Sequence, residues 1–168
     1  RALALYCIAN CAEGEPIERY ERRLRDLKVE DAATPDEREF AAMEDPPEYL
    51  TLKFSQRWES VWVLLWALEF IKKLNRPDDF CDTERITRIA AERGPDSFML
   101  DAVLRPANEI LDALDLTYRY DWAVLDAELY GRRPPAKLQP VVVYERHYAL
   151  KWLTSYQGLD WDNITTDT

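Results

Sequence analysis

The densest run of apolar positions covers residues 61–71, where only Glu69 is polar. Trp58, Trp62 and Trp66 recur every four residues, so their side chains share one side of a helix. A helix that is apolar nearly all round is enclosed by other helices or lies in a membrane. Because this run falls well short of the ~20 residues needed to span a bilayer, we predict a central helix enclosed by a protein core.

Apolar residues recur with helical spacing along most of the remaining chain, without a turn-rich run of alternating strand positions. Boundary signals include Gly14, the capping-box spacing of Thr34 and Glu37, and Asp82. We therefore expect an all-α, single-domain helical bundle of about seven helices around the central Trp-rich helix. The expected helices cover residues 2–13, 16–28, 35–45, 49–74, 83–93, 106–130 and 140–157.

Charged residues fall on the apolar sides of these predicted helices. Glu145 lies at the centre of the apolar face of the last helix, and Glu59 lies between the tryptophans of the central helix. Ionised carboxylates are almost never fully buried unless they are paired. We expect each glutamate to meet an arginine, either Arg57 of the central helix or Arg119 of the helix 106–130. Asp121 lies at the edge of the core stripe predicted for that helix, which consists of Leu111, Leu114, Tyr118, Trp122, Leu125 and Leu129.

Two interpretations of this predicted cluster stay open. In the first, which we favour, it is a structural ion-pair network that joins three helices. In the second, two carboxylates in unequal surroundings have different pKa values and divide the roles of acid and base. A sealed cluster would favour the first interpretation, and a solvent-connected cavity the second.

The remaining metal-ligating residue types do not form a recognisable site. His147, the sole histidine, falls on the predicted polar side of its helix near Lys151 and Thr154, and we do not expect it to be catalytic. Cys7 and Cys11 lie four residues apart on one predicted helix face, but zinc would need further ligands, and only Cys81 and His147 are available, so we expect two buried thiols. The acidic tail, residues 159–168, begins like a calcium loop, but Ile164 occupies a ligand position and no distal Glu follows. We expect no metal and no cofactor, and a tail anchored by Trp161.

The charge of the chain restricts its partners. Thirty-two acidic residues against twenty-two basic ones give a net charge of −10 over 168 residues. Because nucleic-acid binding needs a basic footprint, we expect no nucleic-acid partner, and we expect no membrane partner either. A basic protein would be complementary in charge. The three cysteines do not form a disulfide framework, and we expect a cytoplasmic protein. Because no initiator Met is present, we expect that the N-terminus is truncated.

Several pieces of the sequence, in this order and spacing, resemble the domain of unknown function family numbered 4272, found in bacterial proteins. The resemblance rests on residues 1–7, 57–59, 64–68, 104–105, 115–119, 122–123, 145–147, 149–152, 161–162 and 167–168. It implies one all-helical domain over nearly the whole chain and transfers no catalytic residues. The family pattern has Asn where this chain has Lys151.

Two functions from different classes fit these observations. The first is a non-enzymatic interaction protein that neutralises a basic protein partner. The second is an enzyme that uses an inter-helix Glu/Arg cluster for acid–base chemistry. The residues that we expect to form a polar binding cluster are Arg57, Glu59, Arg119, Glu145, Arg146, Trp161 and Asp162. The identity of the partner and the oligomeric state stay open.

Overall fold

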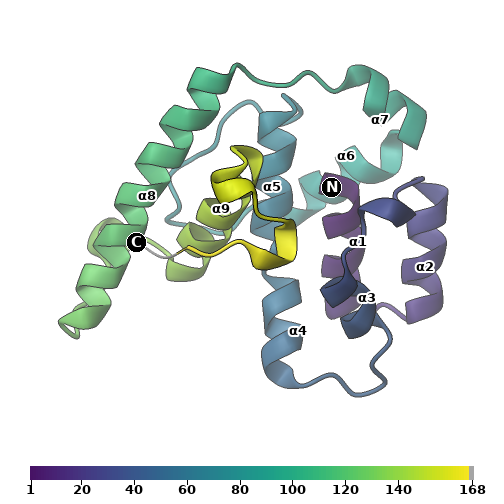
Figure 1. The fold of residues 1–168 in the computed structure, drawn as a ribbon, viewed down its shortest axis with the longest axis horizontal. Coiled ribbons are helices and arrows are strands. Elements are labelled where there is room, and N and C mark those ends of the chain that lie inside the picture. Colours follow the sequence, from purple (N-terminus) through teal and green to yellow (C-terminus); the bar gives the residue numbers. More distant parts are fainter. Residues whose placement is uncertain (167–168) are drawn as a thin grey trace.

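A computed structural model describes residues 1–166, which fold into an all-α, single-domain bundle (Figure 1). The helices are α1 (Ala2–Ala12), α2 (Ile17–Asp26), α3 (Pro35–Ala41), α4 (Glu48–Ser55), α5 (Arg57–Ala67), α6 (Thr83–Glu92), α7 (Pro95–Asp101), α8 (Ala107–Leu129) and α9 (Pro140–Leu153). Short 3₁₀ turns η1 (Glu30–Ala32), η2 (Pro135–Lys137), η3 (Tyr156–Gly158) and η4 (Trp161–Asn163) lie between or after them. Within the described residues no helix is both long and apolar enough to cross a membrane.

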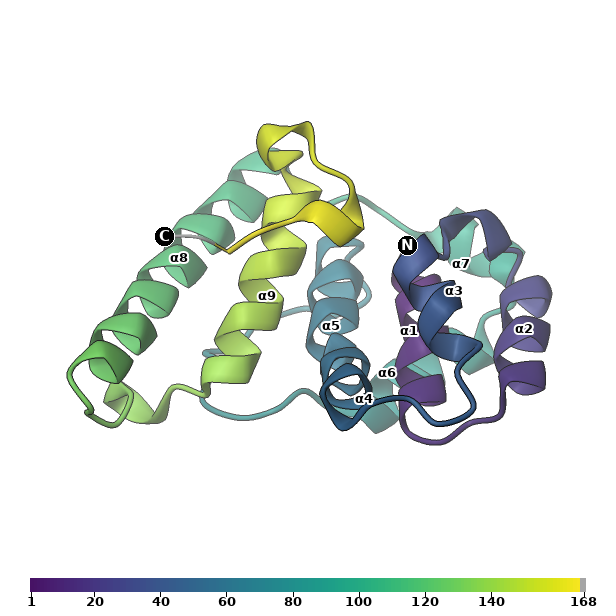
Figure 2. The same ribbon diagram turned by 60° about the horizontal axis from the view of Figure 1, so that its bottom comes forward.

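The principal helices stand side by side in one row, in the order α8, α9, α5, α1 and α2 (Figure 2). Helix α5 contacts α1 on one side and α9 on the other, and α6 and α4 also pack against it. Helix α8 forms one edge of the molecule and packs mainly against α9. Helices α5 and α9 therefore each have a helix on both sides, and the charge cluster described below lies between them.

Helix α5 is the central, enclosed helix that the apolar run predicts. All of its residues are buried, including the charged Arg57 and Glu59. Trp58, Trp62 and Trp66 are 6%, 7% and 6% exposed, so the tryptophan face lies in the core. The expectation of one uninterrupted helix over residues 49–74 has the right start but is wrong in two respects: the helix is interrupted at Gln56, and it ends at Ala67.

The early end of α5 has a backbone cause, whereas Gln56, which separates α4 from α5, keeps helical dihedral angles (φ −73°, ψ −14°). Glu69 adopts a left-handed conformation with φ of 61°, which ends the helix near Ala67. Arg105 then satisfies the freed carbonyls: its backbone N–H donates to the Ala67 oxygen at 2.8 Å, and its Nε donates to the Trp66 oxygen at 3.1 Å. Capping from a segment this distant in sequence leaves no local signal.

Helix α8 has the bounds expected from the sequence, but its predicted core stripe is wrong. Leu111, Tyr118, Trp122, Leu125 and Leu129 are 39–78% exposed, and Leu114 is half-buried. The face that packs inward instead contains Ile110, Thr117, Asp121, Val124 and Ala127. The reason is that α9 presents His147 to α8, and Asp121 on the inward face of α8 pairs with it. The displaced apolar residues are exposed to solvent, although Tyr118 keeps an edge contact with His147 of α9.

Two further differences concern the second half of the chain. The helix expected over residues 83–93 is α6, and the Asp82 side chain caps it by accepting the Arg85 N–H at 2.9 Å. Helix α7, which was not predicted from the sequence, follows as a separate helix after Gly94. Helix α9 ends at Leu153 rather than near residue 157, because Ser155 has a positive φ of 53°. The tail then folds back so that Trp161 and Ile164 are buried.

Candidate functional site: a buried charge cluster between α5 and α9

Two arginine–carboxylate pairs cross between α5 and α9. Nη1 of Arg57 lies 3.1 Å from a carboxylate oxygen of Glu145, and Nε of Arg146 lies 3.0 Å from Oε2 of Glu59. Each helix thus supplies one acid and one base. The four side chains are only 2–4% exposed, so both pairs are largely shielded from water; Arg146 also lines a hollow beside α8.

The carboxylate of Glu145 is fully engaged. Arg57 donates to both of its oxygens at 3.1 Å, and Ser60 Oγ donates to Oε2 at 2.7 Å. The guanidinium of Arg57 also stacks over Tyr148 at 4.4 Å and over Trp161 at 5.6 Å. Burial is the largest single influence and opposes the charge on Arg57, but Glu145, Tyr148 and Tyr144 together outweigh it, so the pKa of Arg57 is raised. Arg57 therefore stays charged.

Glu59 connects the second pair to the loop over residues 68–82. Its Oε1 accepts the backbone N–H of Cys81 at 2.6 Å, while Nη1 of Arg146 donates to the Asn75 carbonyl at 2.6 Å. Burial and the neighbouring Glu59 carboxylate raise the pKa of the Cys81 thiol, which therefore stays neutral. The pair holds the middle of this loop, at Asn75, and its C-terminal end, at Cys81, against α5 and α9.

His147 forms a third buried pair, with Asp121 of α8. Its Nδ1 lies 2.9 Å from Oδ2 of Asp121, and Tyr118 makes an edge contact with its ring at 5.9 Å between centroids. His147 is 0% exposed, so the expectation that it lies on a polar side is wrong. A helical wheel assumes one buried side, whereas α9 is covered by α5 on one side and α8 on the other.

Lys151, one turn later on α9, was also expected on the polar side and is also buried. Its Nζ donates to the Thr165 carbonyl at 3.0 Å and lies 4.6 Å from the centre of the Tyr156 ring. The lysine holds the C-terminal segment against α9.

The structure brings together most, but not all, of the predicted cluster. Arg119 does not join it: its side chain is 72% exposed and pairs with Asp115 at 2.8 Å on the surface of α8. Arg146, not Arg119, is the second base. Trp161 lies over Arg57, and Asp162 lies at the rim, where it accepts the Asp36 N–H at 3.3 Å. The proposed binding role of these residues stays a prediction.

Sequence reasoning missed one more buried charge. The guanidinium of Arg1 pairs with Glu37, donates to the Ala32 carbonyl at 2.6 Å and lies 4.5 Å from the centre of the Trp161 ring. Glu37 also completes the capping box with Thr34, and that part of its role was visible in the sequence. The pairing with Arg1 joins residues 36 positions apart, so no local spacing reveals it.

Comparison with protein families matches residues 1–164 to the domain of unknown function DUF4272. The chain belongs to the DUF4272 family. Comparisons with curated proteins and with solved structures find no match. The segments that resemble DUF4272 include both halves of the cluster, residues 57–59 on α5 and 145–147 on α9. Residues 167–168, on which the resemblance also rests, lie outside the described residues.

The chemistry available to this DUF4272 cluster is limited by its burial. The charged groups are paired with one another and with backbone groups, and their oxygens face protein atoms. Among the described residues, no group of three His, Cys, Asp or Glu side chains is arranged to hold a metal ion. What the cluster can do is fix α5, α9 and the loop over residues 68–82 relative to one another.

Proposed function

We propose that this protein is a non-enzymatic interaction protein that binds a basic, amphipathic helix of a protein partner through the outer face of α8. The observation that carries the proposal is the row of exposed apolar side chains along that face. Leu111, Tyr118, Trp122, Leu125 and Leu129 are spaced three to seven residues apart on one side of the helix. Contiguous exposed apolar residues on a folded protein mark interaction surfaces.

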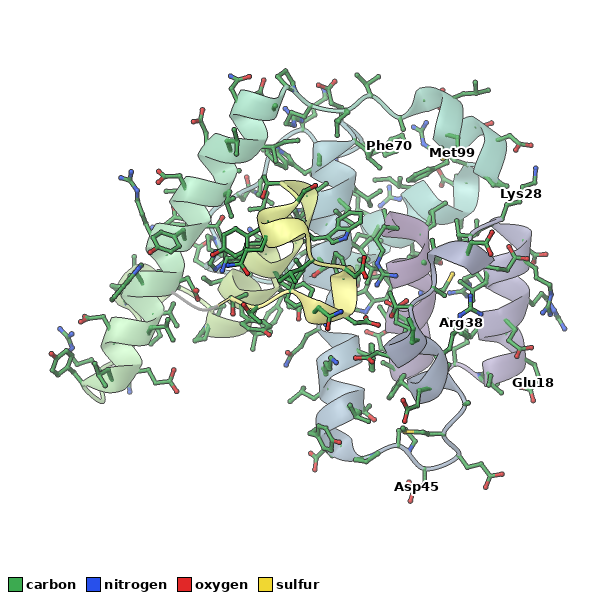
Figure 3. The ribbon with its side chains drawn as sticks, viewed as in Figure 1. Glu18, Lys28, Arg38, Asp45, Phe70 and Met99 are labelled. Atoms are coloured by element: carbon green, nitrogen blue, oxygen red, sulfur yellow. The ribbon has the colours of Figure 1, made fainter. Side chains whose placement is uncertain are left out.

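The shape of this face supports an apolar anchor. Near the end of α8, a hollow of about 530 Å³ is lined by Trp122, Leu125, Leu129 and Tyr130 together with two acids, Asp126 and Glu128. Side chains project from α8 on the side away from α9, where the structure shows no other helix (Figures 1 and 3). An incoming helix can place an apolar side chain in the hollow and its neighbours along the row.

Charge decides between the possible occupants. From residue 107 to residue 129, α8 carries six acids and one arginine, a net charge of −5 (1 − 6). Asp115 and Asp126 lie beside the apolar row, each in an exposed ion pair, with Arg119 and Arg132 respectively. A second copy of the chain would bring two acidic helices together, which is unfavourable, whereas lysines or arginines beside an apolar stripe would complement the net negative charge of α8.

The enzyme hypothesis receives less support from the structure. Acid–base catalysis needs a carboxylate that a substrate can reach, but the side chains of Glu59 and Glu145 are each 2% exposed. Sealed carboxylates favour a structural network, although Arg146 of the same cluster also lines a hollow between α8, α9 and the loop after α5. We also propose a cytoplasmic location, which the free Cys7, Cys11 and Cys81 support, since thiols stay reduced there.

A fluorescent model peptide tests the proposal. We expect an 18-residue (~5 helical turns) Leu/Lys amphipathic helix to bind in fluorescence anisotropy, and its Leu/Glu counterpart not to bind. Trp122→Ser should weaken binding at least tenfold (~1.4 kcal/mol), because buried aromatic anchors dominate such interfaces. The matched control is Leu100→Ser, which alters an 84% exposed leucine on α7, across α5 from α8.

Three outcomes contradict the proposal. The first is equal binding of the basic and the acidic peptide. The second is equal weakening by Trp122→Ser and Leu100→Ser, which would show that overall charge, rather than the α8 face, attracts the peptide. The third is a Trp122-dependent dimer in sedimentation experiments, which would make a second copy of the chain the occupant.

A further inference from the structure

A second hollow lies on the opposite side of α8 from the apolar row, where the loop after α5 meets α8 and α9. Its volume is about 310 Å³, near the lower end of the range for small-molecule sites. Most of its wall is apolar and comes from three separate elements. The apolar and aromatic lining residues are Trp66, Leu74, Pro77, Ala113, Leu116 and Tyr120.

The charged groups of this hollow have the opposite sign to the protein as a whole. Lys73, Arg76 and Arg146 line it, and its described lining includes no Asp or Glu, although the chain carries a net charge of −10. Arg76 is paired with Asp78 at 2.5 Å, and Arg146 with Glu59 at 3.0 Å. Within residues 1–166, no ion pair or hydrogen bond involves the side chain of Lys73. The hollow therefore has one uncompensated positive charge.

Arg146 supplies a fixed donor at this site. Its Nε is bonded to Glu59 and its Nη1 to the Asn75 carbonyl, so the guanidinium plane is held from two sides. Within the described residues, Nη2 makes no hydrogen bond, although Arg146 is only 3% exposed. A donor that is positioned in advance loses little freedom when a ligand binds. Thr117, whose hydroxyl donates to the Ala113 carbonyl at 2.7 Å, adds an acceptor oxygen on the α8 side.

We propose that this hollow binds a small organic anion, a monocarboxylate that carries a flat apolar group. The carboxylate lies between Nη2 of Arg146 and Nζ of Lys73, and the apolar group lies against Trp66, Leu116 and Tyr120. One uncompensated cation matches one negative charge better than the two or more of a phosphate. This site is separate from the α8 face proposed to bind a protein, and either can fail without the other.

Phenylacetate and its uncharged analogue phenylacetamide are the probes. Titration into ¹⁵N-labelled protein should shift amide signals of the loop over residues 68–82 and of α8 near Thr117. A ligand of this size should bind with a dissociation constant of about 1 mM. Phenylacetamide should bind at least five times more weakly (~1 kcal/mol), because it lacks the charge that Lys73 and Arg146 meet. Equal binding of the two probes would overturn the proposal.

Two pairs of variants locate the site. Lys73→Gln should weaken phenylacetate binding about fivefold (~1 kcal/mol), whereas Lys72→Gln, a change at a neighbouring exposed lysine outside the lining, should leave it unchanged. Leu116→Trp should fill the hollow and abolish binding without unfolding the protein, because Leu116 is 49% exposed. Equal effects of the two lysine changes, undiminished binding to Leu116→Trp, or an absence of shifts at about 10 mM phenylacetate would each show that the hollow is not a ligand site.

Discussion

Removal of the Glu145 carboxylate is the sharpest test of the buried cluster. The substitution Glu145→Ala leaves the guanidinium of Arg57, 4% exposed, without a counter-ion in the interior. Breaking a buried pair by removing one partner is far more destabilising than replacing both partners, because the remaining charge has neither water nor a counter-charge. We expect Glu145→Ala to lower the free energy of unfolding by about 3–5 kcal/mol.

The contacts of Glu145 account for this magnitude. The substitution removes the two Arg57 hydrogen bonds and the 2.7 Å bond from Ser60 Oγ, although that hydroxyl also donates to the Glu145 carbonyl at 3.1 Å. The remaining favourable contacts of Arg57 are the aromatic faces of Tyr148 and Trp161, each contributing about 1–2 kcal/mol when desolvated. Stacking lessens the loss but does not replace the counter-ion. The cost therefore stays within the range for an unpaired buried charge.

A double-mutant cycle measures the interaction energy of the Arg57–Glu145 pair separately from the effect of changing each residue alone. Arg57→Met combined with Glu145→Met replaces both charges with apolar side chains. We expect the loss in free energy of unfolding of this double variant to be at least ~2 kcal/mol smaller than the summed losses of the two single variants. Urea unfolding followed by circular dichroism gives each free energy. As a control, Arg119→Ala removes the exposed Asp115 pair and should cost no more than about 0.5 kcal/mol. Additive effects, or a loss below about 1 kcal/mol for Glu145→Ala, would refute the electrostatic reasoning.

Two further predictions concern the core. Trp62→Ala and Trp66→Ala should each cost about 3–5 kcal/mol, since both side chains are largely buried; thermal melts that match the unmodified protein would contradict this. Burial raises the pKa of Cys7 to about 12 and that of Tyr148 to about 12. As the pH rises, both groups therefore ionise first in the unfolded chain, and the stabilisation present below about pH 9 is lost as the pH rises towards 12. Urea midpoints should fall over that range, and a constant midpoint would show that these groups are not buried as described.

The helices that sequence reasoning predicts well are those specified by residues close together in the chain. Helix α5 follows from its own composition, since an element apolar all round has to be enclosed. The capping box at Thr34 and the cap at Asp82 are local signals that the structure reproduces. The early end of α5 is different, because Arg105 satisfies its last carbonyls from a segment that no nearby pattern indicates.

The faces of α8 and α9 could not be predicted for a different reason. A helical wheel sorts residues into one buried side and one exposed side, but α9 is covered on two sides and α8 on one. Polar residues therefore lie inside on α9, where Arg146 and His147 are buried, and apolar residues lie outside on α8. Pairing Glu145 with an arginine followed from its position among apolar residues. Pairing His147 with Asp121 needed the three-dimensional arrangement.

The order Glu145-Arg146-His147 explains why α9 has to be enclosed in this way. Successive residues of an α-helix point about 100° apart, so the three side chains leave α9 in three directions. Glu145 and Arg146 meet their partners on α5, and His147 meets Asp121 on α8. A rotation of α9 that improved one pair would break the others and leave charges buried without partners, at a cost of several kcal/mol each. We infer that the cluster selects one orientation of α9. This orientation directs Asp121 inward and thereby turns the apolar row of α8 towards solvent, which is the face we propose for a partner.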